Sequence, residues 1–80
     1  MTHCILRLPA VKASTGLSRS TLYLRIVQRL FTHSVSLGGR AVGWPAHEVE
    51  ALNAARIAGK PDAEIRALVE TLEAARKSLA

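Results

Sequence analysis

Between Pro9 and Leu30 the apolar positions recur at the spacing of helices. Pro9 to Ser14 predicts a short first helix, which Gly16 ends as a C-cap. Ser18 is a good N-cap for a second helix over 18–29, a stretch without glycine or proline. This second helix carries an apolar stripe at four-residue spacing: Leu22, Ile26, Leu30. One face of it is therefore expected to pack inward, and the opposite face to stay polar and basic.

The period then changes from that of a helix to that of a strand. Val35 and Leu37 alternate with serines, and Val42 and Trp44 alternate with Ala41 and glycine, which predicts a two-stranded β-hairpin over 34–44. Trp44 falls on the same strand face as Val42, so we expect it in the core.

Two glycines form the expected tip of this hairpin. Gly38 and Gly39 tolerate the positive φ angles of a tight two-residue turn. Such a turn would place Val35 opposite Val42 and leave Arg40 at the tip. A longer, bulged turn would change that pairing.

Two more helices are predicted in the second half of the chain. Pro45 starts one, with Val49 and Leu52 as core positions, and Gly59-Lys60-Pro61 stops it. The other spans 62–79. Acidic residues stand near both helix starts, where they oppose the helix dipole: Glu48, Glu50, Asp62, Glu64. This placement explains them without a catalytic carboxylate pair.

The last helix has two interpretations. Its apolar residues keep helical spacing: Ile65, Leu68, Val69, Leu72, Leu79. Folded back, this stripe completes a small core; projected outward, it forms a dimer seam with a short heptad pattern. We favour self-association into a homodimer, because an 80-residue monomer offers only a small binding surface.

The order of elements predicts a mainly α fold with a small two-stranded β-hairpin, namely a winged helix-turn-helix with an extra C-terminal helix. Residues 1–58 would form the DNA-binding domain, and residues 59–80 the core-completing or dimerising helix. A chain of 80 residues has little core from which to build a deep catalytic pocket, so we expect no enzyme.

Charge is distributed unevenly along the chain. Up to His47 there are six basic and no acidic residues, whereas from Glu48 onward five basic residues face six acidic ones. A field of one sign over the first part of a small domain favours double-stranded DNA as partner. The alternative is a basic face that only improves solubility.

Other site types are not expected. The single Cys4 excludes an intrachain disulfide and fits a reducing cytoplasm, and no apolar run is long enough to span a membrane. His3, His33 and His47 lack metal-ligand spacing, so no metal, cofactor or small-molecule ligand is expected.

In a winged helix-turn-helix the second helix enters the major groove, and its first residues face the base edges. The candidate DNA contacts on that helix share a polar, basic or hydroxyl-bearing side chain: Ser18, Arg19, Ser20, Thr21, Tyr23, Arg25, Gln28, Arg29. The hairpin over 34–44, or wing, contributes the residues of its tip, Gly38, Gly39 and Arg40, which would lie on the flanking DNA backbone or in the minor groove. Leu24 is a candidate contact for a thymine methyl group or a cover for a neighbouring apolar surface.

Three motifs in this order resemble the AlpA-type prophage regulators, within the wider excisionase-like and MerR-like winged helices. They are Thr15-Gly16-Leu17-Ser18-Arg19-Ser20-Thr21-Leu22-Tyr23, Leu37-Gly38-Gly39-Arg40-Ala41-Val42, and Trp44-Pro45 with Glu48-Val49. Leu8-Pro9 also fits, and the likeness runs from Leu6 to Ile57. The chain departs from the family pattern at Leu24, where a basic residue is common, and at Leu30 and Thr32, where glycine and proline are common around the Phe.

The resemblance implies a small bacterial DNA-binding transcription regulator from a prophage or mobile element, associated with the nucleoid. The first alternative is an excisionase-like architectural factor that bends DNA for recombination. The second, from another class, is a protein-interaction module that uses the C-terminal helix.

Overall fold

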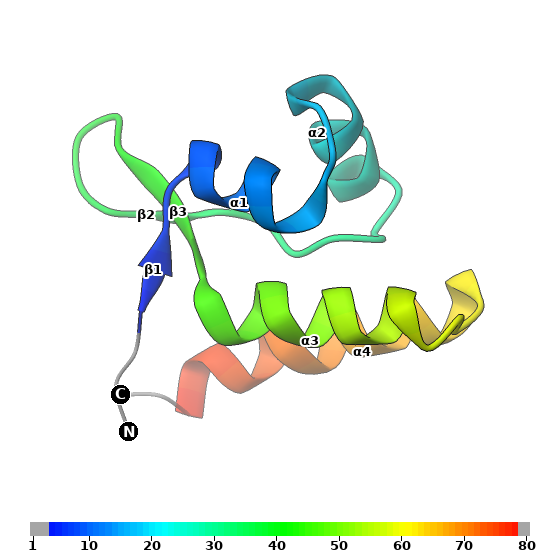
Figure 1. Cartoon of the computed structure of the whole chain (residues 1–80). Coiled ribbons are helices and arrows are strands. Elements are labelled where there is room, and N and C mark those ends of the chain that lie inside the picture. Colours follow the sequence, from blue (N-terminus) through cyan, green and yellow to red (C-terminus); the bar gives the residue numbers. More distant parts are fainter. Residues whose placement is uncertain (1–3, 79–80) are drawn as a thin grey trace.

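The computed structural model describes residues 4–78, which form four helices, three short strands and a terminal helical turn (Figure 1). Along the chain these are β1 (Ile5–Leu6), α1 (Leu8–Thr15), α2 (Arg19–Val27), β2 (Val35–Ser36), β3 (Val42–Pro45), α3 (Ala46–Ile57), α4 (Asp62–Ala75) and the 3₁₀ turn η1 (Arg76–Ser78). The predicted mainly α fold is confirmed, and its order of elements is compatible with a winged helix-turn-helix.

The turn between α1 and α2 uses the two caps expected from the sequence. Gly16 ends α1 in the left-handed conformation, with φ of 73°, and its N–H donates to the carbonyl of Lys12. The Ser18 hydroxyl then accepts a hydrogen bond from the Thr21 N–H at 3.3 Å. Both assignments are confirmed, and together they fix the angle between the two helices.

Helix α2 ends at Val27, two residues before the predicted boundary. Arg29 takes up a left-handed conformation, with φ of 64°. The N–H of Leu30 donates to the carbonyl of Arg25, and the N–H of Arg29 donates to that of Ile26, as in a Schellman motif. Leu30 is still buried, but it lies beyond the helix rather than on it.

The sheet has three antiparallel strands in the order β1-β3-β2, one more than the predicted hairpin. Ile5 pairs with Pro45 and Leu6 with Trp44, so the residues before α1 form an edge strand that the sequence pattern did not reveal. A strand of two residues is too short to show an alternating pattern.

The hairpin register predicted from a two-residue turn is wrong. Val35 pairs with Gly43, not with Val42, and Val42 pairs with Ser36. The N–H of Leu37 donates to the carbonyl of Ala41 at 2.8 Å, which leaves the three residues 38–40 in the turn. This is the longer turn of the alternative interpretation, and it shifts every pair by one residue.

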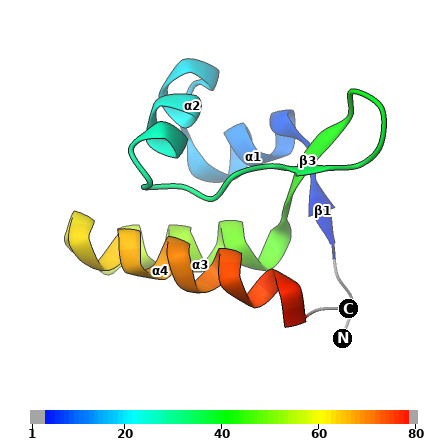
Figure 2. The same ribbon diagram turned by 180° about the vertical axis from the view of Figure 1, so that it is seen from behind.

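Two layers enclose the core (Figures 1 and 2). One layer holds α1, α2 and the sheet; the other holds α3 and α4, which lie side by side. The buried apolar residues of both layers form a single cluster: Val11, Leu22, Ile26, Leu30, Phe31, Trp44, Val49, Leu52, Ile65, Val69. The predicted core positions Trp44, Val49 and Leu52 are confirmed.

Helix α4 folds back onto this core. Ile65 and Val69 are buried in it, and Leu68 and Leu72 pack against it half-buried. Of the two interpretations of the C-terminal stripe, the described chain has the core-completing arrangement; Leu79 lies outside the described residues. Beyond α4, the chain closes with η1 near the start of α3.

A buried ion pair fastens this C-terminal turn. Arg76 Nε and Nη2 donate to the two carboxylate oxygens of Glu48 at 2.8 and 2.6 Å, and Glu48 is fully buried. Arg76 Nη2 also donates to the His33 carbonyl at 2.7 Å. The hydrogen bonds to Glu48 raise the pKa of Arg76. Glu48 does stand in the first turn of α3, as predicted, but its role there is to hold Arg76 rather than only to oppose the helix dipole.

Candidate nucleic-acid interface

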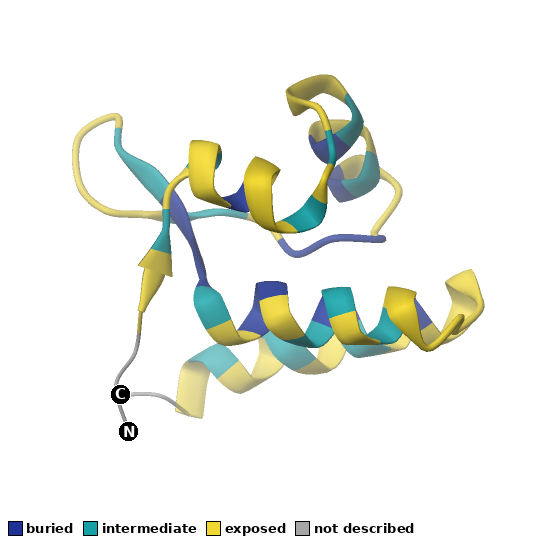
Figure 3. Cartoon of the chain, in the orientation of Figure 1, coloured by how far each residue is buried: buried dark blue, intermediate teal, exposed yellow. Residues whose placement is uncertain are grey.

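Helix α2 and the wing (residues 35–45) project from the same side of the molecule, away from the layer of α3 and α4. Figures 1 and 2 show both on the side opposite that layer, and Figure 3 shows exposed residues along the hairpin loop and the start of α2. All six acidic residues belong to α3 and α4, because the chain has none before Glu48. The fold therefore gathers every Asp and Glu in one layer; from the basic first part of the sequence, Arg29 and His33 still contact carboxylates of that layer, those of Glu70 and Glu73.

The first turn of α2 is organised by hydroxyl groups. Besides accepting the Thr21 N–H, the Ser18 hydroxyl donates to Thr21 Oγ1 at 2.9 Å, and it lies 3.4 Å from Ser20 Oγ. The hydroxyls of Ser18 and Thr21 are thus committed to the cap. Ser20 is exposed on the outer side of the helix and stays available to a ligand.

Arg19 is positioned by two aromatic rings. Its guanidinium carbon lies 5.8 Å from the centre of the Tyr23 ring, and this ring meets the Trp44 ring edge-on at a centroid distance of 6.4 Å. Trp44 is fully buried and donates from its indole N–H to the Thr32 carbonyl at 2.9 Å. The core therefore supports Tyr23, and Tyr23 supports an exposed cation at the start of α2.

The outer face of α2 is more apolar than the sequence pattern indicated. Leu22 and Ile26 are buried on the inner face, so Ser20, Leu24 and Val27 point to the opposite side. Leu24 is 54% exposed and Val27 is 79% exposed. Leu24 is thus more exposed than covered, which leaves it accessible to a ligand.

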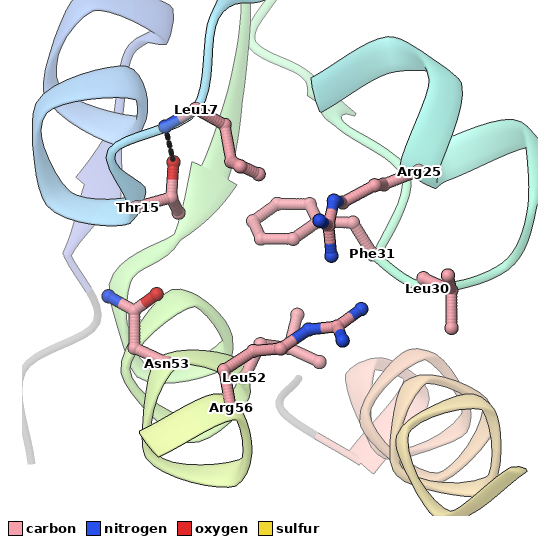
Figure 4. A pocket seen from close by; sticks show the side chains of 8 residues that line it. All are labelled: Thr15, Leu17, Arg25, Leu30, Phe31, Leu52, Asn53 and Arg56. Carbon is pink, nitrogen blue, oxygen red and sulfur yellow. Dashed lines mark hydrogen bonds between the residues drawn. The ribbon is translucent and has the colours of Figure 1, made fainter. Parts of the chain in front are cut away.

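Arg25 lies apart from the other candidate residues of α2. It is half-buried and lines a pocket of about 220 Å³ between the α1–α2 turn, α2 and α3 (Figure 4). The same pocket is lined by Arg56, which also forms an ion pair with Asp62 at 3.5 Å. The remaining lining is mostly apolar: Thr15, Leu17, Leu30, Phe31, Leu52, Asn53.

The C-terminal end of α2 is held by α4. The Gln28 carbonyl accepts a hydrogen bond from Arg66 Nε at 3.0 Å, and Arg29 Nη1 lies 3.6 Å from a carboxylate oxygen of Glu70. Both partners in the Arg29–Glu70 pair are largely exposed, so the pair contributes little to stability. Arg29 is therefore near an acidic side chain, unlike Arg19 in the first turn, and Gln28 is bonded to α4 through its carbonyl.

The wing tip consists of Gly38, Gly39 and Arg40. Both glycines have positive φ, 100° and 56°, a conformation that other residues rarely adopt. The Ser36 hydroxyl accepts the Gly38 N–H at 3.3 Å, and Arg40 is exposed as the last residue of the turn. A short, exposed loop with one cation thus lies in the same layer as α2, with α1 between the two (Figures 1 and 2).

Sequence reasoning missed a polar network between the two layers. The Glu73 carboxylate accepts the His33 N–H at 2.7 Å and lies 2.9 Å from His33 Nδ1, next to the Arg76–Glu48 pair. No spacing rule connects positions 33, 48, 73 and 76, so only the fold reveals the cluster.

Two findings concern other kinds of site. Among residues 4–78, no three His, Cys, Asp or Glu side chains lie together so as to hold a metal ion; His3 lies outside this range. None of the helices described in that range is long and apolar enough to cross a membrane.

Comparison with known proteins extends the resemblance seen in the motifs. Residues 4–57 match the family described as Prophage CP4-57 regulatory protein (AlpA). The chain is 51% identical to Uncharacterized protein ORF88 of Enterobacteria phage P4 over 55 residues, which is 69% of this chain. It spans 62% of the length of that relative. No solved structure matches the chain.

The family match covers β1 to α3, that is, the paired helices α1 and α2 together with the whole wing, and leaves α4 outside. The family is a regulatory one and not an enzyme family. The chain belongs to the AlpA family of prophage regulatory proteins.

Proposed function

We propose that this protein is a sequence-specific regulator that binds double-stranded DNA, with α2 in the major groove and the wing on the flanking backbone or in the minor groove. The observation that carries the proposal is the distribution of charge: the exposed Arg19 stands at the start of α2 and the exposed Arg40 on the wing tip, whereas every Asp and Glu lies in the layer of α3 and α4. A duplex brought to the side of α2 and the wing meets attraction with little opposing charge.

The shape of this side supports the same conclusion. A helix about 10–12 Å wide fits the major groove, which is about 12 Å wide. The first turn of α2 carries Arg19 on its flank and the exposed Ser20 on its outer side. The exposed Arg40 on the wing tip would be free to contact the DNA that flanks the groove occupied by α2.

Salt-titrated binding to duplex DNA tests the proposal. Removal of a cation that binds one phosphate should reduce the slope of log affinity against log salt by about 0.9. We expect this reduction for Arg19→Gln and for Arg40→Gln if each side chain meets one phosphate, and a change in sequence preference where it meets a base edge.

Lys60→Gln is the matched control. It removes the same charge between α3 and α4, where Lys60 lies 4.0 Å from Glu64. Its slope should equal that of the wild type. Wild-type binding that is absent, or independent of salt, would contradict the proposal and would favour the protein-interaction alternative.

A further inference from the structure

A large apolar side chain, Leu24, is exposed in the middle of α2. Leu24 is 54% exposed although the helix buries Leu22 and Ile26 on its other face. Its exposure follows from its position on the helix, because residues two apart from a buried position point away from it. Covering such an exposed leucine with an apolar group of a ligand would remove apolar surface from water and so favour binding.

The residues around Leu24 indicate which kind of ligand could cover it. Leu24 is one turn after Ser20 on the outer face, and Arg19 and Tyr23 flank that face. No carboxylate lies on this part of α2. The residues around Leu24 therefore suit a polyanionic ligand. Leu24 itself would contact an apolar group of that ligand.

Double-stranded DNA offers one apolar group in the major groove, the C5-methyl of thymine. Resting on the proposed function, we propose that Leu24 is a specificity-determining residue that packs against a thymine methyl group, so that the preferred site has thymine at that position. Arg19 and the wing supply affinity for phosphates, and Leu24 supplies discrimination between thymine and the other three bases.

The experiment starts by selecting preferred sites from a random duplex library with the wild-type protein. Each thymine in the selected site is then replaced by deoxyuridine, which lacks only the methyl group. At one position we expect about a fourfold loss of affinity, which corresponds to one buried methyl group.

The protein variants assign that loss to Leu24. In Leu24→Ala the thymine and deoxyuridine duplexes should bind equally, whereas Ile57→Ala should keep the fourfold difference. Ile57 is the matched control, because it is 87% exposed and ends α3 in the other layer. Leu24→Arg should shift the preference at this position from thymine towards guanine, whose O6 and N7 accept hydrogen bonds from arginine.

Three outcomes would overturn the inference. The first is a site in which no deoxyuridine weakens binding, and the second is a loss that persists unchanged in Leu24→Ala. The third is a smaller particle mass for Leu24→Ala than for the wild type without DNA, which would make this face a contact between copies of the chain. In all three, salt-dependent DNA binding would keep the proposed function intact; absence of any DNA binding would instead overturn both.

Discussion

Arg76 places two nitrogens of its guanidinium on the carboxylate of Glu48, a residue 28 positions earlier that is fully buried at the start of α3. The pair joins η1 to α3 and, through the His33 carbonyl, to the segment between α2 and β2. The family match ends at residue 57, so one partner of the pair lies inside the matched segment and the other outside it.

Removing Arg76 alone should destabilise the fold. Arg76→Met leaves the Glu48 carboxylate buried without its cation, and we expect a loss of about 3–5 kcal/mol in the free energy of unfolding. Urea denaturation measures it. The double variant Glu48→Met/Arg76→Met should recover much of the loss, because it buries no charge. A double variant as unstable as the single one would contradict this account of the pair. Glu50→Gln, an exposed change on the same helix, controls for the removal of one carboxylate.

Gly43 is required by the close approach of β1. A Cβ at this position would lie 2.5 Å from Ile5 Cγ2 and 3.0 Å from the Leu6 carbonyl oxygen. We expect Gly43→Ala to destabilise the fold by about 1–3 kcal/mol, the usual range for overpacking. Thermal unfolding measures it. Ile5→Ala should relieve part of the clash, so the double variant should lose less than the sum of the two single variants.

Arg29 is held in a conformation that glycine adopts more readily. Its φ of 64° carries a Cβ penalty, and its ion pair with Glu70 is exposed. Arg29→Gly should therefore stabilise the chain by about 1 kcal/mol. Gln28→Gly is the matched control: its φ is −79°, so glycine there only adds flexibility and should destabilise. Equal effects of the two variants on the urea midpoint would disprove the role of the left-handed residue.

Glu73 makes the free energy of unfolding depend on pH in the acid range. Burial raises its pKa, but the hydrogen bonds from the His33 N–H and ring outweigh this, so the pKa in the folded chain lies below 4.5. The unfolded chain binds this proton first as pH falls. The contribution of Glu73 is thus complete above pH 4.5 and is lost as pH falls through the folded pKa. Urea unfolding at neutral and at strongly acidic pH should show a smaller acid loss for Glu73→Gln than for the wild type.

Local signals in the sequence were sufficient for the helix-turn-helix. Gly16 and Ser18 define their caps through properties of one residue each, and the four-residue spacing of Leu22 and Ile26 defines the buried side of α2. The end of α2 could not be predicted as closely, because Arg29 occupies the left-handed position at which a glycine would have marked the boundary.

Features that depend on distant partners could not be predicted. The hairpin register depends on whether Arg40 belongs to the turn or to the strand, and β1 depends on pairing with a strand some forty residues later. The same holds at the interface: the sequence left two roles open for Leu24, and only the fold showed that more than half of its surface is exposed.

The location of the Arg76–Glu48 pair limits how the helix-turn-helix and the wing can be transferred to another protein. A fragment that ends at Ile57, where the family match ends, would contain Glu48 without Arg76, which neutralises its carboxylate. Its core would also lack Ile65 and Val69. Engineers who graft the helix-turn-helix and wing onto another scaffold should therefore carry the chain through Ser78, or replace Glu48 by an apolar residue and repack the space beneath it.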